Sequence, residues 1–273
     1  MNLQKPSKPL TAPQTREMMI PGAHGDLQAR LYASAATAEG LIVFFPPGRF
    51  VTGNLDEIDS FTRALATRTH CAVLASTYAL APARPFPAAA EDAHAVLAWA
   101  TRHRIALGWK GTRLITAGIE AGGNLAAVSA MMARDRGGPA LAAQVLIMPM
   151  LDSSLTSCSM RTLSGAAGIA AGYRGYLPRV ADCAHPYASP LQSNRLKKLP
   201  PALILSAEQD PLRDEAEQYG AKLIAAGVKT LVKRLPPLLQ QDDARCECIC
   251  KDSVLREIAA FITGLDDYPT PSE

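Results

Sequence analysis

Short apolar runs, separated by longer amphipathic stretches, dominate the pattern of hydrophobic and polar positions along the chain. The apolar runs predict strands at residues 27–32, 41–45, 71–76, 113–117, 144–148 and 202–206. Most of these runs are continuously apolar, which is typical of strands that are buried on both faces of a parallel sheet. The intervening stretches predict helices at residues 56–69, 88–106, 124–135 and 215–226. This alternation predicts βαβ units, and hence a mainly parallel sheet with helices on both faces.

Two segments fall outside this alternation. Residues 1–25 are polar and contain prolines, so we expect an N-terminal tail or a partial lid there. Residues 26–273 have a suitable length for one α/β domain. Within this domain, residues 153–190 are rich in Ser, Gly and Ala and lie between two predicted strands. A long insertion at such a place is typical of a lid or a pocket wall.

Composition and charge exclude several classes of protein. Hydrophobic residues make up 48% of the chain and charged residues 19%, which is typical of a globular domain. Because no apolar run approaches the ~20 residues needed to span a bilayer, and no secretory segment is evident, we expect a cytoplasmic protein without a membrane partner. The net charge of +3 and the absence of a basic stripe argue against a nucleic-acid partner. Nothing in the sequence implies a cofactor.

Six cysteines raise the question of a metal site, and three of them are closely spaced. In a helix, Cys246 and Cys250 would share a face while Cys248 points elsewhere, and no histidine lies nearby. We therefore expect reduced thiols and no bound metal.

The most informative motif is the pentapeptide Gly-Ile-Glu-Ala-Gly at residues 118–122, between a predicted strand and a predicted helix. Gly-x-Ser-x-Gly at such a junction forms the tight turn that presents a nucleophilic serine, and its glycines relieve backbone crowding. Here Glu120 occupies the serine position. The turn is therefore predicted to persist, with a carboxylate in place of the hydroxyl.

Three longer motifs carry a family resemblance. They are Tyr-Ala-Leu-Ala-Pro-Ala-Arg-Pro-Phe-Pro-Ala-Ala at 78–89, Glu-Ala-Gly-Gly-Asn-Leu at 120–125 and Asp-Pro-Leu-Arg-Asp-Glu at 210–215. In this order they resemble motifs of the hormone-sensitive-lipase-like family of α/β-hydrolases, over most of the chain. The resemblance implies an α/β-hydrolase fold, with a mainly parallel central sheet, helices on both faces and a small lid.

The resemblance also implies which positions would carry the chemistry of the family. Glu120 stands at the nucleophile position, Asp210 at the position of the triad acid and Gln240 at the position of the histidine. The His-Gly-Gly-Gly loop of the family corresponds to Pro-Pro-Gly-Arg at residues 46–49. Independently of the family, all five histidines precede Asp210, whereas in this fold the catalytic histidine follows the acid. A side chain that would shuttle protons near neutral pH is therefore missing from the expected place.

These losses predict a catalytically degenerate protein that binds a small apolar ligand and does not hydrolyse esters. Two alternatives stay open: an enzyme that uses Glu120 in non-hydrolytic chemistry, and a carboxylesterase-type hydrolase that works by an unusual route. Ser153, Ser154 and His185 are weaker candidates for replacement catalytic groups. The sequence leaves a homodimer open.

Glu120 is expected to pair with Arg49 across the former catalytic pocket, because a buried carboxylate needs a partner. Direct contact of Glu120 with a ligand and a catalytic role are the alternatives. The residues expected to line the ligand site are Gly48, Arg49, Phe50, Ala121 and Tyr173.

Overall fold

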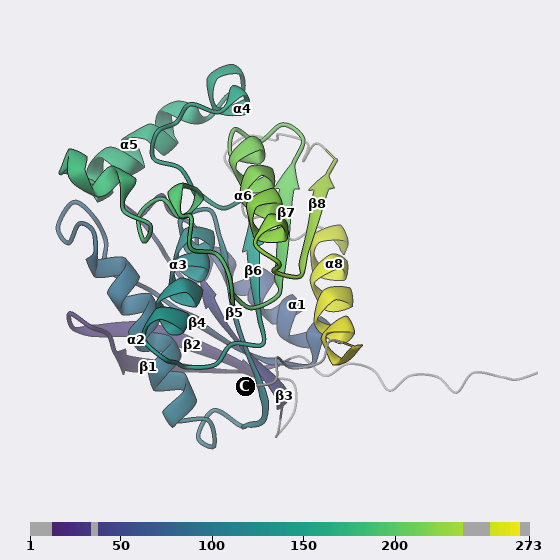
Figure 1. Cartoon of the computed structure of the whole chain (residues 1–273). Coiled ribbons are helices and arrows are strands. Elements are labelled where there is room, and N and C mark those ends of the chain that lie inside the picture. The colour runs from purple at the N-terminus through teal and green to yellow at the C-terminus, as the bar shows by residue number, and fades with distance from the viewer. Residues whose placement is uncertain (1–12, 34–37, 237–251, 268–273) are drawn as a thin grey trace, which may run out of the picture.

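The computed structural model describes residues 13–33, 38–236 and 252–267, and within them the chain forms one eight-stranded sheet. Its spatial order is β1-β2-β4-β3-β5-β6-β7-β8 (Figure 1). The strands are β1 (Gln14–Pro21), β2 (Asp26–Ala33), β3 (Ala38–Phe45), β4 (Ala72–Ser76), β5 (Trp109–Ile119), β6 (Ala143–Ile147), β7 (Ala202–Ala207) and β8 (Thr230–Leu235). In this spatial order, all neighbouring strands from β4 through β3 to β8 pair in parallel. Strand β2 pairs antiparallel with both β1 and β4. The predicted, mainly parallel sheet is thus confirmed.

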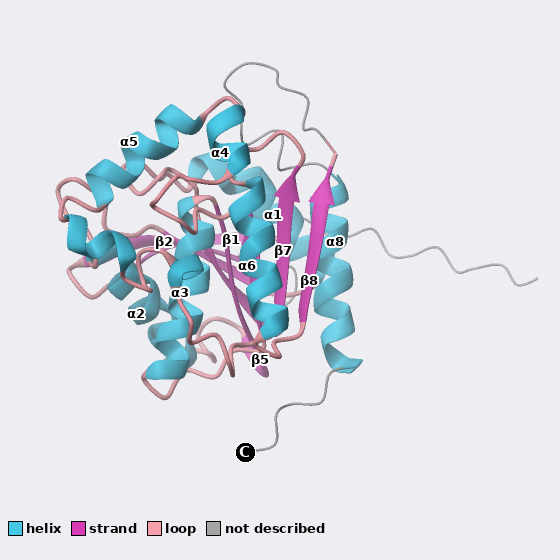
Figure 2. Ribbon diagram, turned by 45° about the horizontal axis from the view of Figure 1, so that its top comes forward, coloured by secondary structure: helices cyan, strands magenta, loops and turns pink. Residues whose placement is uncertain are grey.

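Helices cover both faces of this sheet (Figure 2). One face carries α2 (Ala88–Arg102), α3 (Ala121–Asp135) and α6 (Arg213–Ala225), and the other carries α1 (Asp59–Thr69) and α8 (Asp252–Thr263). The alternation of side chains along β3 explains the two layers. Leu41, Val43 and Phe45 enter the core beneath α2 and α3, whereas Ile42 and Phe44 enter the core beneath α1 and α8. A strand that is buried on both faces therefore reads as one apolar run in the sequence.

The remaining helical elements lie in the connections between strands or at the end of α8. They are η1 (Asp56–Ile58), α4 (Cys158–Thr162), α5 (Ala166–Tyr176), η2 (Val180–Ala184), η3 (Pro190–Gln192) and η4 (Gly264–Asp267). Helices α4 and α5 belong to the 153–190 segment that we predicted as a lid, and they lie at the end of the sheet toward which β7 and β8 point (Figure 1). No helix in the described ranges is long and apolar enough to cross a bilayer.

We expected an N-terminal tail or a partial lid at residues 1–25, but residues 14–21 instead form the outer strand β1 of the sheet. This strand pairs with β2 along its whole length, from Gln14 opposite Ala33 to Pro21 opposite Asp26. Only Ile20 of its eight residues is buried. An edge strand with so little burial lacks the apolar pattern by which strands are recognised in a sequence.

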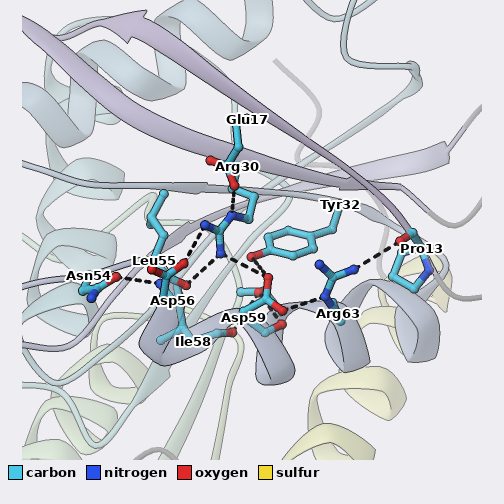
Figure 3. Close-up of polar contacts among 11 residues, drawn as sticks. Pro13, Glu17, Arg30, Tyr32, Asn54, Leu55, Asp56, Ile58, Asp59 and Arg63 are labelled. Atoms are coloured by element: carbon cyan, nitrogen blue, oxygen red, sulfur yellow. Dashed lines mark hydrogen bonds and ion pairs between the residues drawn. The ribbon is translucent and has the colours of Figure 1, made fainter.

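A network of charged side chains fastens β1 and β2 to the start of α1 (Figure 3). Arg30 on β2 contacts Glu17, donates to Asp56 at 2.7 Å and donates to Asp59 at 3.1 Å. Tyr32 also donates to Asp59, at 3.0 Å. Several partners on one guanidinium make this network more stabilising than an isolated surface ion pair. It fixes the chain directly after the loop of residues 46–53, which forms part of the candidate site.

Candidate functional site

Glu120 occupies a sharp turn between the end of β5 at Ile119 and the start of α3 at Ala121. Its φ of 56° and ψ of −112° are sparsely populated by residues other than glycine. The flanking glycines are required by crowding. A Cβ on Gly118 would lie 2.2 Å from the carbonyl oxygen of Gly122, and a Cβ on Gly122 would lie 2.0 Å from that of Phe45. The predicted nucleophile-type turn is therefore present, and it carries a carboxylate.

Backbone and guanidinium donors surround the carboxylate of Glu120, whose side chain is only 8% exposed. Its Oε2 accepts hydrogen bonds from the backbone N–H groups of Gly48, at 3.0 Å, and Arg49, at 3.2 Å. Its Oε1 lies 3.4 Å from Nε of Arg49. The predicted pairing of Arg49 with Glu120 is thus confirmed. Together, these donors compensate for the cost of burying the negative charge.

The loop that supplies the N–H donors has an unusual backbone. Gly48, Arg49 and Phe50 have φ values of 137°, 54° and 67°. The carbonyl of Gly48 accepts the N–H groups of Val51 and Thr52, which closes a tight turn. A side chain at Gly48 would collide with the carbonyl oxygen of Thr52, only 2.0 Å from the added Cβ. Because a non-glycine residue at positive φ costs about 1–3 kcal/mol, surrounding contacts must hold this loop in place.

Two such contacts come from residues that the sequence analysis did not assign to the site. The hydroxyl of Tyr78 donates to the carbonyl of Pro46 at 3.2 Å, and burial, followed by the charge of Glu120, raises the pKa of Tyr78. Helix α5 presents a glycine face to Arg49. A Cβ on Gly172 would lie 2.5 Å from the carbonyl oxygen of Arg49, and a Cβ on Gly168 would lie 2.1 Å from its Nη1. The four-residue spacing of these glycines was the available signal, since it places them on one helix face.

The apolar residues expected to line a ligand pocket lie within the hydrophobic core. Phe50 is fully buried, and its ring stacks on Tyr176 with centroids 3.8 Å apart and an interplanar angle of 6°. Tyr173 is also buried, with its ring centroid 6.1 Å from that of Phe50. Ala121 is buried at the first position of α3. The ring contacts of Phe50 with Tyr173 and Tyr176 join α5 to the loop and so contribute to the position of Arg49.

The other candidate residues make local contacts. Asp210 accepts the N–H of Leu212 at 2.7 Å, and this bond shapes the turn between β7 and α6. Ser153 donates to the carbonyl of Cys183 at 2.9 Å, Ser154 donates to Asp152, and Nδ1 of His185 accepts the N–H of Tyr187 at 3.1 Å. Gln240, Cys246, Cys248 and Cys250 lie outside the described residues. Within the described part of the chain, no group of three His, Cys, Asp or Glu side chains could hold a metal ion.

A buried acid and a cleft complete the surroundings of the site. Glu215 on α6 accepts the N–H of Leu151 at 2.6 Å, and burial raises its pKa well above the usual range.

A cleft of about 590 Å³ lies between the β1–β2 turn and residues 77–84, and Tyr78 and Gly53 form part of its wall. A Cβ on Gly53 would lie 3.6 Å from the carbonyl oxygen of Pro47, so the cleft borders the loop that holds Glu120.

Comparisons with known proteins match this geometry to one family. A family model described as the α/β-hydrolase fold matches residues 42–239. The chain is 34% identical over 229 residues to an arylesterase of Saccharolobus solfataricus, and the match covers 81% of this chain and 74% of that protein. It is 37% identical over 234 residues to the esterase LipI of Mycobacterium tuberculosis, with 82% and 73% covered.

Solved structures of esterases are similar to this chain in fold. A hyperthermophilic esterase from Pyrobaculum calidifontis has a TM-score of 0.84 and 33% sequence identity, with 93% of this chain and 85% of that chain covered. The thermostable carboxylesterase EstE1, cloned from a metagenomic library, has a TM-score of 0.85 and 31% identity, with 95% and 91% covered.

Proposed function

The chain belongs to the α/β-hydrolase family, as its motifs predicted, and from this premise we propose that it is a carboxylic-ester hydrolase in which Glu120 replaces the nucleophilic serine. The expectation of a ligand-binding protein without enzymatic activity is wrong. Relatives that are 34% and 37% identical over about four-fifths of the chain are named esterases. The missing serine and histidine argue against the usual serine route, but they do not exclude a carboxylate nucleophile.

The observation that carries this proposal is the position of the Glu120 carboxylate. One oxygen, Oε2, accepts two backbone N–H groups, while the other, Oε1, lies 3.4 Å from Nε of Arg49. Backbone N–H pairs of this kind stabilise an oxygen on which negative charge develops. The arrangement suits a reaction in which Oε1 forms a bond to the substrate and Oε2 becomes the charged oxygen of a tetrahedral intermediate.

In the first step, Oε1 of Glu120 bonds to the carbonyl carbon of the ester, and the bond from that carbon to the alcohol oxygen breaks. The alcohol leaves as an anion and takes a proton from water. Glu120 then carries the acyl group as a mixed anhydride, which is a covalent intermediate of the kind that carboxylates form in other hydrolases. The sharp turn and the Arg49 contact hold Oε1 in place for this attack.

In the second step, water adds to the side-chain carbonyl carbon of Glu120 and loses its protons to solvent. The negative charge develops on Oε2, where the N–H groups of Gly48 and Arg49 already donate. Removing one such donor typically costs about 10²–10³-fold in turnover. The anhydride bond then breaks, the acyl group leaves as a carboxylate, and Glu120 is restored. Since an anhydride is far more electrophilic than an ester, this step depends less on a histidine base.

The mechanism implies a preference for esters with good leaving groups. All five histidines precede Asp210 in the sequence, so the usual general acid is missing from its place. A phenoxide leaves without prior protonation much more readily than an alkoxide does. We therefore propose small aryl esters as the preferred substrates.

Hydrolysis of para-nitrophenyl acetate by the purified protein tests this proposal. The wild type should hydrolyse this ester above the rate in buffer, and it should act much more slowly on ethyl acetate. Glu120→Gln keeps the shape of the side chain but removes its charge, so its rate should fall by about 10²-fold or more. Glu257→Gln is a matched control, because Glu257 lies on α8 and pairs with Lys233 at 3.6 Å.

A serine-directed phosphonate should leave the wild-type activity intact. Unchanged rates in Glu120→Gln, or full inhibition by the phosphonate, would show that another group carries the reaction. Ser153 and Ser154 would then be the next residues to change.

A further inference from the structure

Arg49 uses its guanidinium group differently from Arg30 and Arg213, which are also partly buried. Each of those two directs both amino groups, Nη1 and Nη2, to carboxylate or carbonyl oxygens. Within the guanidinium of Arg49, Nε is the atom that bonds to Glu120, at 3.4 Å. Among the described residues, no oxygen accepts a hydrogen bond from its amino groups, although five donors on a guanidinium are normally well used when it is partly buried.

The side chain of Arg49 is nevertheless held in a defined place. Its Nη1 lies so close to Gly168 on α5 that a Cβ there would approach it to 2.1 Å. The carbonyl oxygen of Arg49 is also close to Gly172, where a Cβ would lie 2.5 Å from it. The side chain is 31% exposed, so part of the guanidinium can be reached from outside. A fixed, accessible guanidinium edge beside a reactive carboxylate is suited to binding a second group of the substrate.

We propose that Arg49 selects substrates that carry a carboxylate in addition to the ester group. Carboxylates match the planar fork of a guanidinium and form charge-assisted hydrogen bonds with it. This inference rests on the proposed ester hydrolysis, and it adds the substrate class. The second carboxylate belongs either to the acyl part or to the alcohol part of the ester, because both parts are attached to the carbonyl carbon that Glu120 attacks.

The charge of Glu120 makes the selectivity for anionic substrates depend more strongly on Arg49. Without the guanidinium, the buried carboxylate of Glu120 would repel an anionic substrate. Removing the positive charge should therefore disfavour anionic esters in two ways, through lost hydrogen bonds and through unopposed repulsion. Neutral esters should lose much less. The ratio of rates for matched anionic and neutral esters thus reports on Arg49 separately from any general loss of activity.

Two matched pairs of substrates distinguish the two sides of the ester. On the alcohol side, para-acetoxybenzoate is compared with its methyl ester. On the acyl side, the mono-para-nitrophenyl ester of adipic acid is compared with methyl para-nitrophenyl adipate, in which the free carboxyl group is methylated. For at least one pair, wild-type kcat/KM should favour the anionic member by roughly tenfold or more, which is the effect of one charge-assisted hydrogen-bonded pair. This preference should weaken as NaCl is added.

Arg49→Gln should reverse the preference, whereas Arg49→Lys should keep part of it. Arg174→Gln is the control, because Arg174 is exposed on the same helix, α5, and its change removes the same charge. An equal rate for anionic and neutral esters in the wild type, or an equal change in the Arg174 variant, would overturn the proposal.

A binding measurement separates failure of this inference from failure of the hydrolase proposal. Para-hydroxybenzoate and adipate should raise the melting temperature of the wild type and of Arg174→Gln, but not of Arg49→Gln. These shifts would support the anion site even if no ester were hydrolysed. If neither acid shifts the melting temperature of the wild type, Arg49 does not bind carboxylates.

Discussion

Replacing Gly172 by alanine should impair catalysis far more than it impairs stability. Gly172 lies within α5, where alanine would favour the helix by about 1 kcal/mol relative to glycine. The new Cβ, however, would lie 2.5 Å from the carbonyl oxygen of Arg49 and 2.6 Å from its Cβ. Neither atom can move by a change of rotamer, so the loop or the helix must shift. Overpacking of this kind costs about 1–3 kcal/mol, and the net loss of stability should be about 0–2 kcal/mol.

The effect on turnover follows from the position of the shifted atoms. The N–H groups of Gly48 and Arg49 both donate to Oε2 of Glu120, and displacement by about 1 Å in a catalytic site can cost 10²-fold. Steady-state kinetics with para-nitrophenyl acetate should therefore show kcat/KM lower by about 10–100-fold, while the melting temperature falls by only a few degrees.

Gly175→Ala is the matched control for this change. A Cβ on Gly175 would lie 3.0 Å from a methyl group of Val51 and 4.0 Å from the Cβ of Ala81, with no backbone atom among these neighbours, so that variant should keep most of its activity. Unchanged kcat/KM in Gly172→Ala, or equal losses in the two variants, would refute the view that α5 positions the loop.

Three further predictions concern the charged groups. Glu120→Ser should be nearly inactive toward para-nitrophenyl acetate, because no histidine follows Asp210 to activate the new hydroxyl, and a lost triad histidine costs about 10⁶-fold in a serine protease. In urea denaturation, the double change Arg49→Gln with Glu120→Gln should lower the free energy of unfolding by about 1 kcal/mol less than the two single changes added together, because each single change leaves one charge unpaired. Strict additivity would show that the pair is not coupled. Burial raises the pKa of Asp59, but hydrogen bonds from Arg63 and Tyr32 outweigh it and leave this pKa below its ordinary value. Its contribution to stability is thus present above the unfolded-state pKa of about 4 and lost as pH falls through the folded-state pKa, so Asp59→Asn should flatten the acid limb of a stability–pH curve.

The elements buried on both faces of the sheet were predictable from the sequence, and the edges were not. The runs at 41–45 and 202–205 are continuously apolar because both of their faces meet helices. The edge strands β1 and β8 have mostly exposed or half-buried side chains, so their residues show little of the apolar pattern. The helix α8 was also missed, although its buried residues, such as Val254, Ile258 and Phe261, recur at helical spacing.

Within the site, the contact between Arg49 and Glu120 was predictable from the sequence. The order of motifs placed Arg49 opposite Glu120, and the structure brings them together. The bonds from Gly48 and Arg49 to Oε2 depend on three successive positive φ values, which the sequence does not specify. The functional expectation failed for a related reason. Counting absent triad residues says nothing about where the replacing carboxylate lies, and that position is what supports a carboxylate nucleophile.

The most direct test of the proposed mechanism follows oxygen from water into the protein. The purified enzyme would turn over para-nitrophenyl acetate in water enriched in oxygen-18, and the peptide that contains Glu120 would be analysed by mass spectrometry. If water adds to the carbonyl carbon of Glu120, heavy oxygen should accumulate in that peptide, and no accumulation should occur without substrate or in Glu120→Gln. Heavy oxygen found only in the released acetate, with none in Glu120, would contradict the addition of water to the side-chain carbonyl carbon of Glu120.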